Sequence, residues 1–285
     1  MLLKEYKFNF QQELQSVYDE QEIDSFFYIL LEAFHDMKRV DLVLQHDFEL
    51  DGMQLLQWET VLDQLKKQKP IQYILGETEF YGLPFYVNEN TLIPRPETEE
   101  LVDWIITENL KIEKFKDLKI LDVGTGSGCI AISLAKNLPN AKVYAMDVSE
   151  KALEIARKNA KRNEVTIEFL HQSILETEDL LQSFDIIVSN PPYVRNLEKE
   201  EIEKNVLDFE PHLALFVEDH DALLFYRKIT ELAANNLPTN GQLYFEINQY
   251  LGNDMVELLQ KNNFRQIELR KDIYGNDRML FGRKL

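Results

Sequence analysis

Three short segments of the chain carry residues whose types and spacing could do chemistry, and the first of them is rich in glycine. Residues 120–128 read Ile-Leu-Asp-Val-Gly-Thr-Gly-Ser-Gly, which predicts a buried strand, then a loop, then a helix. Glycine permits tight turns and close approach of a ligand to the backbone, and a helix N-terminus favours an anionic group by roughly 0.3–1 kcal/mol. The spacing matches neither the dinucleotide fingerprint nor the P-loop. The residues predicted to bind a ligand here are Asp122, Gly124, Thr125, Gly126, Ser127 and Gly128.

The second segment is an acidic residue at the end of the next predicted strand, Val143-Tyr-Ala-Met-Asp147. In doubly wound sheets, an acid about twenty residues after the glycine loop accepts hydrogen bonds from ribose hydroxyls. Asp147 could instead cap the helix predicted from residue 151, although Ser149 could do that in its place. The glycine loop and Asp147 together are a stronger indication of a nucleoside-containing ligand than either alone.

The third segment is Asn190-Pro191-Pro192-Tyr193, directly after a strand predicted to end at Ser189. Two prolines remove two backbone donors and stiffen the loop, so its carbonyls act as acceptors. The Asn190 side-chain oxygen and the Pro191 carbonyl can accept both N–H bonds of one –NH2 group, while the Tyr193 ring can cover a planar face. A plain turn is the alternative, since Asn-Pro often starts turns. Because the segment directly follows a central strand, we favour a binding site for a primary amide or exocyclic amine over a plain turn.

The elements that must position these segments alternate between strand and helix from residue 101 onward. This alternation predicts an α/β fold with a doubly wound, mostly parallel, Rossmann-like sheet that is covered by helices on both faces. Ligands bind such sheets at the carboxyl ends of the strands. The predicted strands are 119–123, 142–146, 166–170, 185–189 and 242–247. The predicted helices are 130–137, 151–163, 222–236 and 251–261.

The region before residue 76 has a different pattern and predicts a small helical bundle. Apolar residues recur at three- and four-residue spacing in residues 51–68, with Asp51 placed as an N-cap, and residues 21–37 form a broad apolar face. Short apolar runs interrupted by glycine, proline and asparagine then suggest a hairpin-like connector. The predicted domains are residues 1–75, the connector 76–96, and the α/β domain 97–285.

Composition limits the partners and the location of the protein. The 285 residues carry a net charge of −19, which disfavours binding to bare DNA or RNA through phosphates, because that requires clustered basic residues. A protein or small-molecule partner fits better. The single cysteine, Cys129, excludes an intrachain disulfide, and no apolar segment is long enough for a signal peptide or membrane span, so we expect a cytoplasmic protein without membrane association. The histidine spacing predicts no metal site.

With these motifs in this order, the sequence resembles the class I S-adenosylmethionine-dependent methyltransferases, and specifically the N5-glutamine methyltransferases that modify peptide chain release factors. The resemblance covers essentially the whole chain. The Asn-Pro-Pro-Tyr motif is shared with DNA adenine and other base methyltransferases, whereas Thr91–Glu99 is the most specific stretch. The further matching segments are Pro70–Gly76 with Glu79 and Phe80, Phe209–Pro211 and Asp272–Gly275.

The resemblance implies S-adenosylmethionine as the cofactor and the glutamine of a release factor Gly-Gly-Gln motif as the methyl acceptor. In this family the residue 124–128 loop would hold the methionyl end, Asp147 the ribose, and Asn190 with Pro191 the acceptor amide. Where the family often has an acid followed by an aromatic residue near the adenine, this chain has Ser173-Ile174. The helical domain would dock the substrate protein.

The residues expected to act on the acceptor are Asn190, Pro191 and Tyr193 as catalytic residues, with Pro192 and Arg95 completing the substrate site. Arg95 could line the mouth of the site or pair with Glu97 or Glu99. The runner-up function is a nucleic-acid base N-methyltransferase that extrudes its target base. A non-catalytic binding module is disfavoured, because both the cofactor loop and the acceptor loop are intact.

Overall fold

The computed structural model describes residues 1–110 and 118–285, which divide into two units. One unit contains residues 1–76 and 203–209, and the other contains residues 77–202 and 210–285. No helix among the described residues is both long and apolar enough to span a membrane. The predicted domain boundaries and the expected cytoplasmic location stay predictions.

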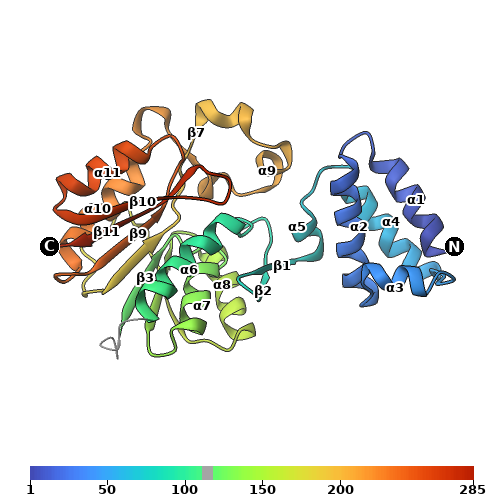
Figure 1. Ribbon diagram of the computed structural model, residues 1–285, viewed down its shortest axis with the longest axis horizontal. Helices are drawn as coiled ribbons and strands as arrows, with labels where there is room; N and C mark the ends of the chain where they lie inside the picture. Colours follow the sequence, from blue (N-terminus) through green and yellow to red (C-terminus); the bar gives the residue numbers. More distant parts are fainter. Residues whose placement is uncertain (111–117) are drawn as a thin grey trace. The chain divides into compact units, whose positions relative to one another are not determined.

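The first unit is a bundle of short helices around one aromatic core (Figure 1). The helices that supply this core are α1 (Leu3–Leu14), α2 (Glu20–His35), α3 (Arg39–Leu44), α4 (Gly52–Leu65) and α5 (Ile71–Leu75), and α9 (Lys204–Phe209) also belongs to the unit. The Asp51 side chain accepts hydrogen bonds from the backbone N–H groups of Met53 and Gln54, so the predicted N-cap is confirmed. Helix α2 ends where Asp36 adopts a left-handed conformation. The predicted helical bundle is therefore confirmed.

Trp58 is the centre of that core. Its indole ring is fully buried, lies 5.0 Å from the Phe27 ring in a tilted arrangement, and meets Tyr6 and Phe10 edge to face. Its Nε1 donates a hydrogen bond to His35 Nε2 at 2.9 Å, so the one polar atom of the ring is satisfied. Burial of a large ring with its polar atom paired is strongly stabilising.

The predicted connector begins with a β-hairpin, β1 (Glu77–Phe80) and β2 (Leu83–Tyr86). Tyr81 and Gly82 form the two-residue loop and both have positive φ, the combination that matches the twist of a tight hairpin. Phe80 is buried in the core of the second unit. The Asn159 side chain pairs with both the N–H and the carbonyl of Tyr86, which fastens the hairpin to helix α8 (Glu150–Arg162). The hairpin-like connector is confirmed.

The second unit contains a seven-stranded sheet in the order β10-β11-β9-β6-β3-β4-β5. Its strands are β3 (Lys119–Val123), β4 (Lys142–Asp147), β5 (Ile167–His171), β6 (Ile186–Ser189), β9 (Gln242–Glu246), β10 (Phe264–Lys271) and β11 (Asp277–Lys284). All neighbours from β5 to β9 pair in parallel, and β11 is antiparallel to both β9 and β10. The predicted doubly wound, mostly parallel sheet is confirmed.

Helices cover both faces of this sheet, as the alternating side chains of its strands require (Figure 1). On one face, Ile120 of β3 packs in a core with α6 (Pro96–Leu110) and α7 (Cys129–Asn137). On the other face, Leu121 packs with α10 (Leu224–Asn236) and α11 (Gly252–Lys261). The central strands are buried on both sides, which explains their continuous apolar runs.

The predicted strands are found within one residue at each end, and the predicted helices of this unit within two. Strands β10 and β11 were not predicted, because β10 is an edge strand in which charged residues break the apolar pattern. The remaining short elements are β7 (Val194–Arg195), β8 (Phe216–Val217), η1 (Asn196–Glu201), η2 (His212–Ala214) and η3 (Asp219–Asp221).

Truncation of Trp58 should destabilise the helical unit. We expect Trp58→Ala to lower the free energy of unfolding of this unit by about 3–5 kcal/mol, because it leaves a large cavity between aromatic rings. Leu56→Ala, on the same helix but at a side chain that is 67% exposed, should change it by less than about 0.5 kcal/mol. Urea titration followed by circular dichroism measures both, and equal effects would contradict the assignment of Trp58 as the core centre.

Candidate active site

Three loops meet at one edge of the sheet because the strands that lead to them end at the same level. Val123 at the end of β3 lies opposite Met146 of β4 on one side and Ser189 of β6 on the other. The glycine loop, Asp147 and Asn190 follow directly after these residues. Strand order reverses direction around β3, the position at which open α/β sheets bind ligands.

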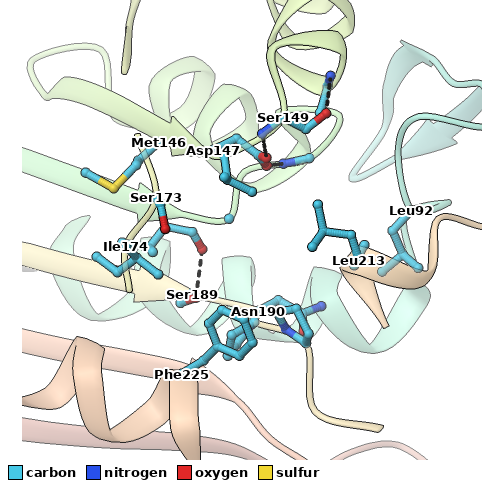
Figure 2. Close-up of a pocket in the computed structure, with 18 of the residues that line it drawn as sticks. Leu92, Met146, Asp147, Ser149, Ser173, Ile174, Ser189, Asn190, Leu213 and Phe225 are labelled. Carbon is cyan, nitrogen blue, oxygen red and sulfur yellow. Dashed lines mark hydrogen bonds between the residues drawn. The ribbon is translucent and has the colours of Figure 1, made fainter. Parts of the chain in front are cut away.

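A cavity of about 230 Å³ lies at this edge. Figure 2 shows Met146 and Ile174 on one side and Leu92 and Leu213 on the other, with Asp147 and Asn190 between them. Of the predicted site residues, those that line this cavity are Gly124, Gly126, Asp147, Ser173, Ile174, Asn190, Pro191 and Pro192. The structure therefore brings all three predicted segments, and the Ser173-Ile174 pair, to one cavity.

The glycines of the loop fall into two kinds. Gly124 and Gly126 line the cavity with positive φ, and a Cβ at either position would meet no protein atom within 4 Å. A Cβ at Gly128 would instead come within 2.9 Å of Ile132 and 3.2 Å of Ala156. The first two glycines leave room next to the cavity, whereas Gly128 permits close packing of two helices.

Asp147 supports the glycine loop as well as facing the cavity. Its Oδ2 accepts a hydrogen bond from Gly126 N and its Oδ1 accepts one from Ser149 N, both at 2.8 Å. Ser149 itself caps α8 through Ala152 N, so Asp147 is not the helix cap. Each carboxylate oxygen retains capacity for a further hydrogen bond. Burial raises the pKa of Asp147, and the backbone hydrogen bonds oppose this rise.

Asp122 lies beneath the loop and does not line the cavity. Its Oδ2 accepts hydrogen bonds from Thr125 Oγ1 at 2.6 Å and Ala131 N at 3.2 Å, and its Oδ1 has no partner among the described residues. Complete burial raises the pKa of Asp122 to about 7. Thr125, Ser127 and Gly128 also lie outside the cavity lining, so the structure places these predicted ligand-binding residues in the support of the loop.

A second, smaller cavity of about 60 Å³ shares part of its wall with the first. Leu92, Asn190, Pro191 and Ala214 line both cavities. The other residues of the smaller cavity are Arg95, Tyr193, Val194, Leu215 and Glu246. The Asn190-Pro191 pair thus stands at the boundary between the two spaces.

The acceptor atoms at that boundary are free to bind a donor. Asn190 Nδ2 donates to Thr98 Oγ1 at 3.3 Å. Within residues 1–110 and 118–285, no group donates a hydrogen bond to Asn190 Oδ1 or to the Pro191 carbonyl. Both oxygens are therefore available as hydrogen-bond acceptors where the two cavities meet.

Arg95 lines the smaller cavity, and of the two alternatives left open for it, the pairing with Glu97 or Glu99 is not found, because its acidic partner is Glu210. Its Nη2 donates to Glu210 Oε1 at 2.5 Å, and Ile93 N donates to Glu210 Oε2 at 3.1 Å. The Glu210 side chain is 1% exposed, whereas Arg95 is 34% exposed. This buried carboxylate joins the segment around Arg95 to the segment that contributes Leu213 and Ala214 to the cavity.

Much of the apolar wall was not identified from the sequence. Phe225 and Ile229 come from helix α10, and Leu213 from a short 3-10 helix, all far along the chain from the glycine loop. Met146 could have been found, because it immediately precedes Asp147 on a predicted strand. The other residues of the cavity wall that were not predicted are Asn90, Thr91, Leu92, Val123, Val148, Ser149, Ala152, Gln172, Leu175, Ser189, Pro211 and Ala214.

Comparison with known proteins agrees with this architecture. A family model described as "Methyltransferase small domain" matches residues 104–209, and one described as "PrmC N-terminal domain" matches residues 9–76. The fold and the cavity define a class I S-adenosylmethionine-dependent methyltransferase. A "Release factor glutamine methyltransferase" from Flavobacterium psychrophilum is 75% identical over 98% of both chains, and one from Bacteroides thetaiotaomicron is 46% identical over 95% of this chain and 96% of its own. The chain belongs to the release factor glutamine methyltransferase family.

Two solved structures share the fold alone. A 16S rRNA methyltransferase from T. thermophilus, in complex with AdoMet and guanosine, is 20% identical and has a TM-score of 0.51 over 73% of this chain and 50% of its own. The hMettl16 catalytic domain is 17% identical and has a TM-score of 0.54 over 72% of this chain and 76% of its own. The first of these likenesses shows that this sheet architecture also occurs in an rRNA methyltransferase.

The larger cavity fits the chemistry of S-adenosylmethionine. Met146, Ile174 and Leu175 offer an apolar wall for the adenine ring, and the Asp147 carboxylate retains acceptor capacity for ribose hydroxyls. Gly124 and Gly126 leave space where any larger residue would project a side chain. The lining of the cavity thus offers an apolar wall, an acidic acceptor and open space beside the glycine loop.

The buried Asp122 carboxyl should make stability depend on pH in a defined direction. Because the pKa is about 7 in the folded protein and near 3.8 when exposed, the folded state holds a proton that the unfolded state releases, so stability falls as pH rises through this window. Asp122→Asn keeps an acceptor for Thr125 and Ala131 but cannot ionise. We expect wild type to lose on the order of 2 kcal/mol relative to this variant between pH 5 and pH 8. Thermal unfolding across that range measures this, and parallel curves would contradict it.

Proposed function

We propose that this protein transfers a methyl group from S-adenosylmethionine to the side-chain amide nitrogen of the glutamine in the Gly-Gly-Gln motif of peptide chain release factors. One observation carries the proposal: a cofactor-sized cavity and a smaller cavity meet at Asn190 and Pro191, whose oxygen atoms accept no hydrogen bond among the described residues. Membership of the family supports it further, since relatives of 75% and 46% identity bear the name of that activity.

The acceptor amide needs activation because its nitrogen lone pair is delocalised into its carbonyl. Acceptance of both its N–H bonds by Asn190 Oδ1 and the Pro191 carbonyl returns electron density to the nitrogen and aims it at the larger cavity. S-adenosylmethionine supplies an already activated methyl group on a positively charged sulfur. As the nitrogen–carbon bond forms, the carbon–sulfur bond breaks, and one proton then leaves the nitrogen for solvent.

Alignment is the main contribution of the protein in this scheme. Holding two reactants in a near-attack geometry can supply roughly 7–11 kcal/mol of a barrier. In this proposal the smaller cavity receives the substrate amide and is called the acceptor cavity. Pro192 stiffens the loop, and Tyr193 covers the planar face of the amide. Arg95 holds the mouth of the acceptor cavity in place through its ion pair with Glu210. Asn190 and Pro191 also form part of the cofactor wall.

The runner-up function, methylation of a nucleic-acid base, is opposed by the charge of the protein. An exocyclic amine of a base could meet the same two acceptor oxygens as a glutamine amide. The net charge of −19 disfavours binding of DNA or RNA through phosphates, and relatives of 75% and 46% identity bear the name of the glutamine activity, so we favour the glutamine amide.

We also propose that the helical unit docks the release factor, in keeping with the match of residues 9–76 to the PrmC N-terminal domain. Helix α3 and the start of α4 carry several exposed apolar side chains, among them Val43, 75% accessible, and Met53, 84% accessible. Exposed apolar side chains of this kind favour contact with another protein.

Replacement of Asn190 should separate binding from turnover. We expect Asn190→Ala to keep its affinity for S-adenosylmethionine within a few-fold of wild type and to lose turnover by at least about 100-fold, because one of two amide acceptors is removed. Asn236→Ala, whose side chain bonds to Leu232 of its own helix and to no other described residue, should retain normal turnover. Single-turnover assays with labelled cofactor and calorimetry measure the two quantities, and a near-normal rate for Asn190→Ala would disprove the assigned role.

The substrate itself is tested by offering labelled cofactor with release factor, with release factor lacking the Gly-Gly-Gln glutamine, and with DNA or RNA. Label on the intact release factor alone is the expected result. Label on nucleic acid alone would keep the fold and the cofactor but overturn the proposed substrate.

Charge on the exposed apolar side chains should weaken docking without affecting chemistry. We expect Val43→Asp combined with Met53→Asp to raise KM for release factor about tenfold at unchanged kcat, since a loss of about 1.4 kcal/mol in binding corresponds to that factor. Glu59→Lys, elsewhere on α4, serves as a charge control. An unchanged KM for the double variant would refute docking through these residues.

A further inference from the structure

A line of buried polar groups runs from the proposed acceptor loop into the protein. Asn190 Nδ2 donates to Thr98 Oγ1 at 3.3 Å, and Thr98 Oγ1 donates to Glu246 Oε2 at 2.5 Å. Thr98 is 2% exposed and Glu246 is 1% exposed. The three residues lie at the end of β6, in the first turn of α6 and at the end of β9, so the contact exists only in the folded protein.

The direction of these hydrogen bonds follows from proton counting. A threonine hydroxyl has one proton, and a carboxylate oxygen can only accept. When the Thr98 proton points to Glu246, only lone pairs of Thr98 Oγ1 face Asn190, so the –NH2 end of Asn190 must lie toward Thr98. Its Oδ1 is then turned toward the acceptor site.

Other groups hold Glu246 as an acceptor. Tyr193 Oη donates to Glu246 Oε1 at 3.1 Å, and Arg278 Nη1 lies 3.5 Å from the same tyrosine oxygen. Arg278 in turn donates through Nε to Asp272 Oδ2 at 3.1 Å. Each oxygen of Glu246 therefore accepts a hydrogen bond from a neighbouring hydroxyl. The guanidinium of Arg278 contacts one of those hydroxyls, that of Tyr193.

The orientation matters because the two ends of an asparagine amide are nearly identical in shape. If the amide were reversed, its –NH2 group would face the –NH2 group of the substrate, two donors would oppose each other, and the site would lose one of its two acceptors. Local sterics alone do not distinguish the two orientations. A specific hydrogen-bond partner does.

We infer that Thr98 and Glu246 are positioning residues that fix the orientation of the Asn190 amide, so that Oδ1 faces the nitrogen to be methylated. This inference rests on the proposed function of Asn190 as an acceptor for the substrate amide. Thr98 lines neither cavity and acts through Asn190, whereas Glu246 also lines the smaller cavity and acts on Asn190 through Thr98.

The experiment compares four variants of the full-length protein in methylation of purified release factor. Thr98→Val removes the hydroxyl at constant shape, and we expect kcat to fall about 10-fold to 100-fold, with little change in cofactor affinity. Thr98→Ser restores the hydroxyl and should recover most of the rate. Glu246→Gln retains the side-chain shape but can donate to Thr98, which releases the Thr98 proton toward Asn190 Oδ1, so kcat should fall here too. Thr230→Val is the matched control, because the buried Thr230 hydroxyl has no partner among the described residues.

The outcomes separate this inference from the proposed function. Wild-type protein that fails to methylate release factor would overturn the proposed function. Active wild type with Thr98→Val and Glu246→Gln both within twofold of its kcat would overturn the inference alone. A Thr98→Ser variant as slow as Thr98→Val would also overturn it, as would a loss of cofactor affinity that matches the loss of rate. If Thr98→Val does not fold, kcat and cofactor affinity are measured for Glu246→Gln alone. A lower kcat at unchanged cofactor affinity would support the inference, and a kcat within twofold of wild type would overturn it.

Discussion

The parallel register of β3 with β4 and β6 is the constraint on which the rest of the site depends. Because Val123, Met146 and Ser189 lie side by side, the loops that follow them begin at the same level of the sheet. A one-residue slip in either pairing would turn every side chain of that strand to the opposite face, so burial on both faces enforces the register. The cofactor cavity and the acceptor loop are consequences of that alignment.

Buried acids lie beneath both loops, and each has a distinct task. Asp122 receives hydrogen bonds from the glycine loop and the start of α7, whereas Glu246 receives them from Thr98 and Tyr193 near the acceptor loop. Burial raises the pKa of Glu246, and the hydrogen bonds and the nearby guanidinium of Arg278 oppose that rise. An acid without such donors would be costly in this environment, so the site and the stability of the fold are coupled.

Ion pairs hold two further parts of the fold in place. The pair of Arg95 and Glu210 joins two segments that are 115 residues apart in the chain, and that of Arg278 and Asp272 closes the turn between β10 and β11. Both pairs involve stretches that match the family pattern, residues 91–99, 209–211 and 272–275. These motifs therefore contain residues that hold segments of the fold together.

Local pattern was sufficient to determine the helical bundle, the hairpin, five parallel strands and the loops after three of them, because periodicity, capping residues and glycine or proline act over a few neighbouring residues. The roles of individual site residues stay predictions. Only the tertiary structure decided that Arg95 pairs with Glu210 rather than with a neighbour, that Phe225 and Leu213 close the cavity, and that Thr98 and Glu246 stand behind Asn190. These hydrogen bonds join residues 92 to 148 positions apart, so they depend on how the helices and strands pack, which no local spacing encodes.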